Sequence, residues 1–313
     1  MSRLIADIGA TNARFAIAND AGIEHIDVLP CDDFPTLADA AQAYLSRVGG
    51  VKPQTGAFAV AIPLSGADEV SMTNHGWSFS ISGTRKALGF DKLDVINDFT
   101  ALALGITHLT EADYYKVGGG ESAQGAPIGI IGPGTGLGVG AVVFGRDGAP
   151  VPVTTEGGHV TMPASNEREF RLFEWLKQTK YHHISAERVI SGKGLVNIYH
   201  GLCGLDGLNL PEKTPAEITE AALARSCPVC VETLDLFCHF LGVAAGNVAL
   251  TYGAFGGIYI AGGIVPRLGS YFAASRFMQS FLEKGRFKDY LAPIPVRVIT
   301  HPYPGLEGLK YLD

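Results

Sequence analysis

Two glycine-rich turns, each set between a pair of predicted strands, constrain the fold of this chain more than any other feature. The first glycine turn separates residues 4–9 from 14–18, and the second, Gly132–Gly138, separates residues 127–131 from 139–144. Helices and further strands follow each pair. The repeated pattern predicts two α/β domains, each beginning with a hairpin around a glycine-rich turn.

The other elements are predicted from hydrophobic periodicity and from the glycine and proline positions. A length of 313 residues also agrees with two domains, at about 100–200 residues per domain. Helices are predicted over residues 36–47, 100–105, 167–177, 215–225, 231–251 and 270–284, and strands over residues 57–62, 93–96, 257–261 and 296–299.

Composition narrows the class of protein. Glycine makes up 40 of 313 residues, about 13%, against about 7% in average proteins. Apolar residues make up 47% and charged residues 18%, and the glycines follow no period, which excludes disorder, collagen and coiled coil. The net charge of −7 argues against nucleic acid or an anionic membrane as the main partner. A small anionic ligand remains compatible, because a few N–H groups and cations suffice to bind it.

The five cysteines are few and odd in number, which predicts reduced thiols packed as small apolar side chains. Cys227 and Cys230 resemble half of a zinc site, but no second pair lies at a matching distance. The full set is Cys31, Cys203, Cys227, Cys230 and Cys238.

The sequence predicts a soluble, cytoplasmic protein. Arg3 and Asp7 interrupt the start of the chain before an apolar signal segment can form. Residues 240–266 carry no charge and are long enough to cross a bilayer. Glycine and asparagine break this run, so we expect a buried helix, a turn and a buried strand.

The first glycine turn, Asp7–Arg14, places a carboxylate before a tight hairpin of small residues. Such a turn can aim N–H groups and the Thr11 hydroxyl at phosphate oxygens, while Asp7 holds a hydrated Mg²⁺. The alternative is an ordinary hairpin with Gly9 at a positive φ.

The second glycine turn is not a P-loop, because no Gly-Lys-Ser/Thr follows it. Residues 136–141 satisfy the dinucleotide pattern G-x-G-x-x-A, but that pattern requires a following helix, and residues 139–144 are typical of a strand. Because both glycine turns lie between a pair of predicted strands, together they favour a nucleotide held between two lobes.

Several motifs together resemble the bacterial glucokinases of the hexokinase–actin–Hsp70 superfamily. The first and second glycine turns match the two phosphate motifs of that family, and Ala261-Gly262-Gly263 matches its adenosine motif. Ala10 departs from the family, which usually has a second glycine there. Further matches, in the family's order, are Met72–His75, Asn97–Ala101, Glu156–His159, Ser185–Arg188 and Ser191–Leu195.

The resemblance implies a fold of two ribonuclease-H-like α/β domains around a central cleft. The small domain would comprise residues 1–107 and 299–313, and the large domain residues 108–298. Glucose would bind between the domains and draw them together, which excludes water from the phosphoryl group.

The resemblance also implies an ATP-dependent kinase that phosphorylates the 6-hydroxyl of glucose, working as a homodimer. Asp98 would be the general base, with a helix N-cap as its structural alternative. Glu187 could instead be a solvated charge and His159 a turn residue. The implied glucose contacts are Asn97, Asp98, Glu156, His159 and Glu187. The implied ATP contacts are Ala6, Asp7, Ile8, Gly9, Ala10, Thr11, Gly134, Thr135, Gly136, Gly262 and Gly263, with Asp7 holding Mg²⁺ through water.

Other functions stay open beside this one. The Glu156–His159 loop also resembles the ROK family of kinases and repressors, but residues 160–165 contain no cysteine for that family's zinc. A broader hexose kinase, a sugar-binding regulator of the same fold and an NAD-dependent dehydrogenase are the further alternatives. The sequence does not rank the hexoses, nor ATP against ADP or polyphosphate as the phosphoryl donor.

Overall fold

A computed structural model describes residues 2–62, 64, 66–72 and 76–312 and divides into two compact units. Unit 1 comprises Met1–Thr110, Pro150–Thr154 and His301–Asp313, and unit 2 comprises Glu111–Ala149 and Thr155–Thr300. The boundaries between the units at residues 110/111 and 300/301 lie within three residues of the predicted domain boundaries. Pro150–Thr154 groups with unit 1, although the sequence prediction gave it to the large domain. Of the Met72–His75 motif, residues 73–75 lie outside the described residues.

The elements of unit 1 are seven strands besides Pro150–Thr154, four α-helices and a short 3₁₀ helix among the described residues. The strands are β1 (Arg3–Ile8), β2 (Asn12–Asn19), β3 (Gly22–Pro30), β4 (Thr55–Val60), β5 (Glu69–Ser71), β6 (Ser78–Ser80) and β7 (Lys92–Asn97). The helices are η1 (Cys31–Asp33), α1 (Leu37–Val48), α2 (Ile81–Leu88), α3 (Asp98–Ile106) and α11 (Pro304–Lys310).

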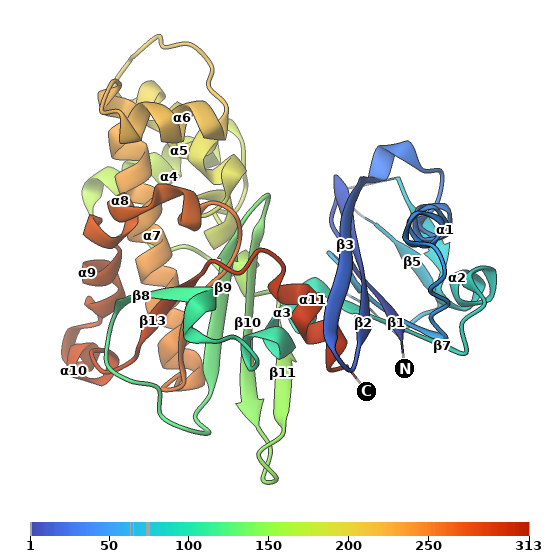
Figure 1. Cartoon of the computed structure of the whole chain (residues 1–313). Coiled ribbons are helices and arrows are strands. Elements are labelled where there is room, and N and C mark those ends of the chain that lie inside the picture. The colour runs from blue at the N-terminus through green and yellow to red at the C-terminus, as the bar shows by residue number, and fades with distance from the viewer. Residues whose placement is uncertain (1, 63, 65, 73–75, 313) are drawn as a thin grey trace. The chain divides into compact units, whose positions relative to one another are not determined.

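The main sheet of unit 1 runs in the order β3-β2-β1-β4-β7 (Figure 1). β1 pairs antiparallel with β2 and parallel with β4, and β4 pairs parallel with β7. Because side chains alternate along a strand, Leu4 of β1 packs in the core that contains Tyr44 of α1, while Ile5 packs with Ala101 of α3 and Leu306 of α11. Both faces of the sheet are therefore covered by helices.

The second sheet runs in the order β11-β10-β9-β12-β13-β8. Five of its strands belong to unit 2, whereas β11 is the Pro150–Thr154 segment that groups with unit 1. Here β9 pairs antiparallel with β10 and parallel with β12. The strands are β8 (Tyr114–Gly118), β9 (Ile128–Pro133), β10 (Leu137–Phe144), β11 (Pro150–Thr154), β12 (Gly257–Ile260) and β13 (Val296–Ile299). The helices are η2 (Glu111–Asp113), η3 (Gly157–His159), α4 (Glu167–Thr179), η4 (Ala186–Arg188), α5 (Gly192–Leu205), α6 (Pro215–Leu223), α7 (Pro228–Tyr252), η5 (Val265–Leu268), α8 (Ser270–Ala274), α9 (Phe277–Leu282), η6 (Gly285–Phe287) and α10 (Lys288–Leu291).

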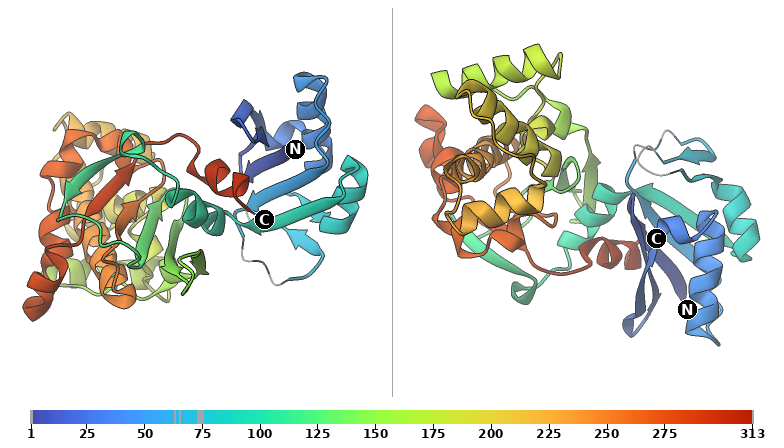
Figure 2. Two further views of the ribbon diagram at one scale, coloured as in Figure 1. Left: turned by 60° about the horizontal axis from the view of Figure 1, so that its bottom comes forward. Right: turned by 90° about the horizontal axis from the view of Figure 1, so that it is seen from above.

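Helix α7 forms the centre of the unit 2 core, and α5, α6 and α9 pack against it (Figure 2). By length and composition α7 could cross a membrane, but 78% of its most apolar window is buried within the structure. It ends at Gly253, whose φ of 58° is left-handed, and β12 follows from Gly257. The expected helix, turn and strand are confirmed.

The predicted helix over residues 270–284 is wrong as a single element. It is divided into α8 and α9 at Ser275, whose backbone is extended. The Ser275 hydroxyl accepts a hydrogen bond from the Phe277 N–H at 3.2 Å. Serine side chains compete with helical hydrogen bonds in this way, which explains the break.

Candidate active site

The first glycine turn joins β1 to β2 in unit 1. Gly9 donates its N–H to the Asn12 carbonyl at 3.0 Å, and the Thr11 carbonyl accepts from the Cys31 N–H at 2.9 Å. The φ of Gly9 lies outside the left-handed region, so the reading of this glycine as a positive-φ residue is wrong. A Cβ at Gly9 would instead lie 3.3 Å from the Asn12 carbonyl oxygen, and this close approach favours glycine. Ala10 and Thr11 stand at the tip of the turn, half-buried and exposed respectively.

Asp7 stands near the end of β1, opposite Arg14 of β2 in the hairpin register. Its Oδ2 lies 3.4 Å from an Arg14 guanidinium nitrogen. Burial raises the pKa of the Asp7 carboxyl, and the Arg14 charge and hydrogen bond only partly oppose that rise. Asp7 is thus a partly buried carboxylate with the Arg14 guanidinium beside it.

Asn97 and Asp98 stand where β7 passes into α3. Asn97 is the N-cap residue, and its Oδ1 accepts from the N–H groups of Phe99 at 2.9 Å and Thr100 at 3.3 Å. Its Nδ2 donates to the Ile62 carbonyl at 3.1 Å. Asp98 is the first helical residue, so the alternative reading of Asp98 as the N-cap is wrong. Because Asn97 caps the helix, the Asp98 side chain is not required as the cap.

The pKa of the Asp98 carboxyl is raised well above its usual value. Burial, and after it the charge of Asp7, raise the pKa of Asp98 from 3.8 to about 6, against the opposing hydrogen bond from the Phe99 N–H. That hydrogen bond measures 2.9 Å to Asp98 Oδ1. A carboxyl that titrates near neutral pH, beside a second carboxylate, has the properties of a general base.

The second glycine turn joins β9 to β10 in unit 2. Pro133 pairs with Leu137 in the hairpin, and the Gly134 N–H donates to the Gly136 carbonyl at 2.8 Å, which leaves Thr135 exposed at the tip. A strand follows the turn, as predicted, so the dinucleotide-binding pattern lacks the helix it requires.

Two neighbouring segments of unit 2 hold this turn in place. The Gly192 N–H at the start of α5 donates to the Gly134 carbonyl at 2.8 Å. Gly262, after β12, has a φ of 82°, and a Cβ there would overlap the Pro133 carbonyl. The adenosine motif therefore packs directly against the second glycine turn, and glycine is required at that contact.

A cavity of about 640 Å³ opens beside Gly134 and Thr135. Apolar side chains from α5 and α6, including Leu195, Pro215 and Leu223, line it together with two cations, Lys193 and Arg267. Apolar walls with a few charged groups suit an aromatic base and its phosphates. The sequence prediction missed Lys193 and Arg267, although Lys193 lies in the quoted Ser191–Leu195 motif.

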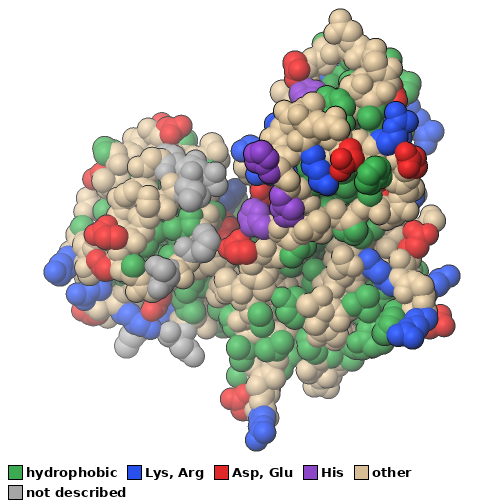
Figure 3. Space-filling view, turned by 180° about the vertical axis from the view of Figure 1, so that it is seen from behind, with side chains coloured by type: hydrophobic (Ala, Val, Ile, Leu, Met, Phe, Trp, Pro, Cys, Tyr) green, Lys and Arg blue, Asp and Glu red, His purple; other side chains and the backbone are tan. Residues whose placement is uncertain are grey.

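The Glu156–His159 loop contains η3 and lies against the η4 segment. The Val160 carbonyl, one residue after the loop, accepts from the Ala186 N–H at 2.9 Å. His159 Nε2 lies 3.7 Å from Glu156 Oε2, and both side chains are about 60% exposed, at 59% and 60%. Figure 3 shows that imidazole side chains gather on one face of unit 2.

Glu187 of η4 is half-buried, so the reading as a freely solvated charge is wrong. Its Oε2 accepts a hydrogen bond from the Leu137 N–H at 3.0 Å. Glu187 thereby joins the η4 segment to the second glycine turn. Unit 2 brings together the three predicted sugar contacts Glu156, His159 and Glu187, and unit 1 brings together Asn97 and Asp98.

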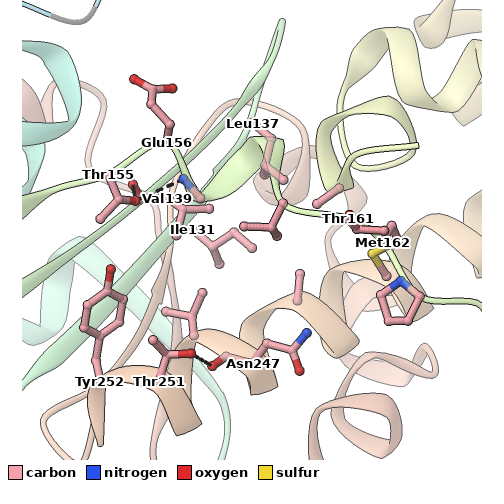
Figure 4. A pocket seen from close by; sticks show the side chains of 16 residues that line it. Ile131, Leu137, Val139, Thr155, Glu156, Thr161, Met162, Asn247, Thr251 and Tyr252 are labelled. Carbon is pink, nitrogen blue, oxygen red and sulfur yellow. Dashed lines mark hydrogen bonds between the residues drawn. The ribbon is translucent and has the colours of Figure 1, made fainter. Parts of the chain in front are cut away.

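A second cavity, of about 440 Å³, lies between the Glu156–His159 loop and α7 (Figure 4). Ile131, Val139 and Met162 contribute to its mainly apolar wall. The Glu156 carboxylate points away from these apolar side chains (Figure 4). Thr155 closes the turn above them, since its hydroxyl donates to the Val139 carbonyl at 2.8 Å and accepts from the Gly157 N–H at 3.1 Å.

Two acidic groups of unit 1 could hold a cation. Within the described part of the chain, no three His, Cys, Asp or Glu residues group as a metal site. Asp7 and Asp98 lie close enough for the Asp7 charge to raise the pKa of Asp98, and both present oxygen atoms. Carboxylate oxygens of this kind are the ligand type that Mg²⁺ takes when it retains most of its water.

The fold and these residues define the class: a two-domain protein of the actin-like sugar kinase type. The family model described as Glucokinase matches residues 4–312, and the chain belongs to this family. A glucokinase of Paramagnetospirillum magneticum is 48% identical over 99% of this chain and 96% of its own length.

Solved structures agree with this classification. The crystal structure of a glucokinase from an Antarctic psychrotroph is 36% identical, with a TM-score of 0.88 over 98% of this chain and 97% of that chain. A Balamuthia mandrillaris glucokinase crystallised with glucose is 21% identical, with a TM-score of 0.82 over 99% of this chain and 92% of that chain, which supports the fold.

Proposed function

We propose that this protein is an ATP-dependent glucokinase, which transfers the γ-phosphoryl group of ATP to the 6-hydroxyl of glucose. Membership of the Glucokinase family supports the reaction. The observation that carries the mechanism is Asp98, a carboxyl at the start of α3 whose pKa is raised to about 6.

Asp98 is the general base of the proposed reaction. As the 6-oxygen of glucose bonds to the γ-phosphorus, its proton passes to an Asp98 carboxylate oxygen, and the bond from the γ-phosphorus to the bridging oxygen breaks to release ADP. A pKa of about 6 keeps Asp98 mostly ionised at neutral pH while it remains basic enough to take the proton. General base catalysis of this kind contributes about 10²–10⁴-fold.

Glucose is held by polar groups from both units in this proposal. Asn97 uses one Nδ2 hydrogen on the Ile62 carbonyl, which leaves the second for a sugar hydroxyl. Glu187 uses Oε2 on the Leu137 N–H, so Oε1 is the oxygen we assign to the sugar. Glu156 and His159 have exposed side chains that can accept from and donate to neighbouring hydroxyls.

ATP binds to the glycine turns and the adjoining cavity. The backbone of Gly134–Gly136 and of Gly9–Thr11 contacts the phosphates, and the 640 Å³ cavity holds the adenosine. Lys193 and Arg267 add positive charge beside it. Mg²⁺, when bound, neutralises phosphate charge, and Asp7 would hold it through water. We further propose that the enzyme is a cytoplasmic homodimer.

A coupled assay with a panel of substrates tests the proposed function. Glucose, mannose, fructose and glucosamine are each assayed with ATP, ADP and polyphosphate. We expect the highest kcat/KM for glucose with ATP, because a site built on paired hydroxyl contacts rejects an altered hydroxyl. Similar kcat/KM values for several sugars would replace the proposal by a broader hexose kinase. Glucose binding without turnover would replace it by a sugar-binding regulator.

A further inference from the structure

Two cysteines occupy the first turn of α7, outside the residues that we assign to glucose and ATP. Cys227 is the N-cap residue of the helix, Pro228 is the first helical residue, and Cys230 follows in the same turn. All five cysteines are free thiols, and Cys227 is half-buried whereas the other four are buried. The predicted packing of the cysteines as reduced, apolar side chains is confirmed, and Cys227, which packs against the core while only partly buried, is the most accessible of the five.

Access and reactivity differ between the two thiols. Ser226 and Pro228, on either side of Cys227, are exposed, so a small reagent can approach it. Cys230 is fully buried, at 0% exposure. Helix N-termini favour thiolates, and an accessible thiolate beside a buried thiol is the usual arrangement of a reactive dithiol.

The pKa values of the two thiols shift in opposite directions. Burial raises the pKa of the Cys227 thiol, but the neighbouring Cys230 thiol, the N–H groups of Cys230 and Val229 and the charge of Lys213 outweigh burial, so the net direction is downward. Burial, together with the neighbouring Cys227, raises the pKa of Cys230 to about 12. Of the two thiols, Cys227 is thus the better nucleophile.

The spacing suits a disulfide between these two cysteines. The Cys227 and Cys230 thiols lie within hydrogen-bond reach of each other, since each acts as a side-chain hydrogen-bond partner of the other. A disulfide requires Cβ atoms about 3.5–4.5 Å apart, and neighbouring thiols at the start of one helix are the arrangement from which such a bond can form. Cys203 of α5 also lies near Cys227, but it is buried and its pKa is raised mainly by that burial.

We propose that Cys227 and Cys230 form a redox-active dithiol that a low-molecular-weight organic disulfide oxidises to an intramolecular disulfide. The Cys227 thiolate attacks one sulfur of the reagent, which forms a mixed disulfide and releases one thiolate. Cys230 then loses its proton and attacks Cys227 Sγ, which closes the protein disulfide and releases the second thiol. Two electrons pass from the two cysteines to the reagent.

The test treats the reduced full-length protein with glutathione disulfide and maps the products by alkylation and peptide mass spectrometry. We expect a transient glutathione adduct on Cys227, followed by loss of two hydrogens in the peptide that contains both cysteines. Before oxidation, iodoacetamide at neutral pH should modify Cys227 on the order of tenfold faster than Cys31 or Cys238.

Three variants make the assignment specific. Cys230→Ser should retain the glutathione adduct on Cys227, because the thiol that displaces it is absent. Cys227→Ser should leave Cys230 unreacted, and Cys203→Ser, the matched control, should close the disulfide like the natural chain. Equal alkylation rates at all cysteines, a mixed disulfide that persists in the natural chain, or closure through Cys203 would overturn the proposal. Circular dichroism of each variant verifies folding.

Discussion

The ionised form of Asp98, which the proposed reaction requires, is the form that the folded protein disfavours. The pKa of Asp98 is raised in the folded state by burial and by Asp7, so folding favours the protonated form. That contribution to stability is complete below the unfolded value of 3.8 and is lost as the pH rises through about 6. At pH 7, the ionised group therefore destabilises the fold.

Asp98→Asn should stabilise the protein at pH 7. Because the neutral amide avoids the cost of burying a charge, we expect the free energy of unfolding to rise by up to about 2 kcal/mol. Urea unfolding of both proteins at pH 7 measures the change, and the difference should shrink at pH 4. A variant less stable than the natural protein at pH 7 would show that the Asp98 charge is well satisfied.

The pH dependence of kcat/KM should follow the ionisation of Asp98. We expect kcat/KM for glucose to fall about tenfold per pH unit below about pH 6, because the protonated carboxyl accepts no proton. Asp7→Asn should move this midpoint to lower pH, since the Asp7 charge helps to raise the pKa. Asp91→Asn, an exposed control, should leave the midpoint in place. A midpoint unmoved by Asp7→Asn would contradict the coupling of the two carboxylates.

The sequence predicted the place of Asp98 at the end of a strand, but not which residue caps the helix. Asn97 and Asp98 both suit an N-cap. The choice depends on where β7 ends, and the pairing of Asn97 with Val60 of β4 fixes that point. Glu187 shows the same limit: its hydrogen bond to Leu137 spans fifty residues and leaves no local signal in the sequence.

At the scale of elements, the position of α3 depends on its crossing with α11. A Cβ at Gly105 of α3 would overlap the Pro304 carbonyl, and a Cβ at Gly308 of α11 would overlap the Ala101 carbonyl. The backbones of the two helices therefore touch. This contact joins residues remote in sequence, so periodicity predicts two helices but not the glycine contact between them.

Gly308→Ala should destabilise unit 1 by about 1–3 kcal/mol through overpacking. Helix propensity alone predicts the opposite sign, a gain of about 0.5–1 kcal/mol. Thermal unfolding measures the difference, and kcat should also fall because α3 begins with Asp98. Gly148→Ala is unsuitable as the control because its φ of 80° would strain an added side chain, and Gly134→Ala because it lies in the second glycine turn. The control is Gly76→Ala, at an exposed glycine with no atom of the described residues within 4 Å of the added methyl, which should be neutral. Equal or greater stability of Gly308→Ala would refute the close crossing.

At the scale of the whole molecule, the repeated hairpin predicted two α/β units, since both sheets contain an antiparallel pair around a glycine turn. The grouping of Pro150–Thr154 with unit 1 was not predictable from local pattern. It depends on contacts with α3, such as that between the Thr100 and Thr154 hydroxyls at 2.8 Å.

Glucose should draw the two units together, because we assign its contacts to residues of both. Small-angle X-ray scattering should show a smaller radius of gyration at saturating glucose, with sorbitol at the same concentration as the control. Unchanged dimensions with glucose bound, as verified by calorimetry, would count against closure.

The central claim is that Asp98 takes the proton during phosphoryl transfer. Steady-state kinetics of Asp98→Asn with glucose and ATP test it directly, with folding verified by the unfolding experiments above. We predict that kcat falls by about 10²–10⁴-fold while glucose still binds, because the amide retains hydrogen bonding but accepts no proton. A kcat within a few-fold of the natural enzyme would contradict the assignment and require another base.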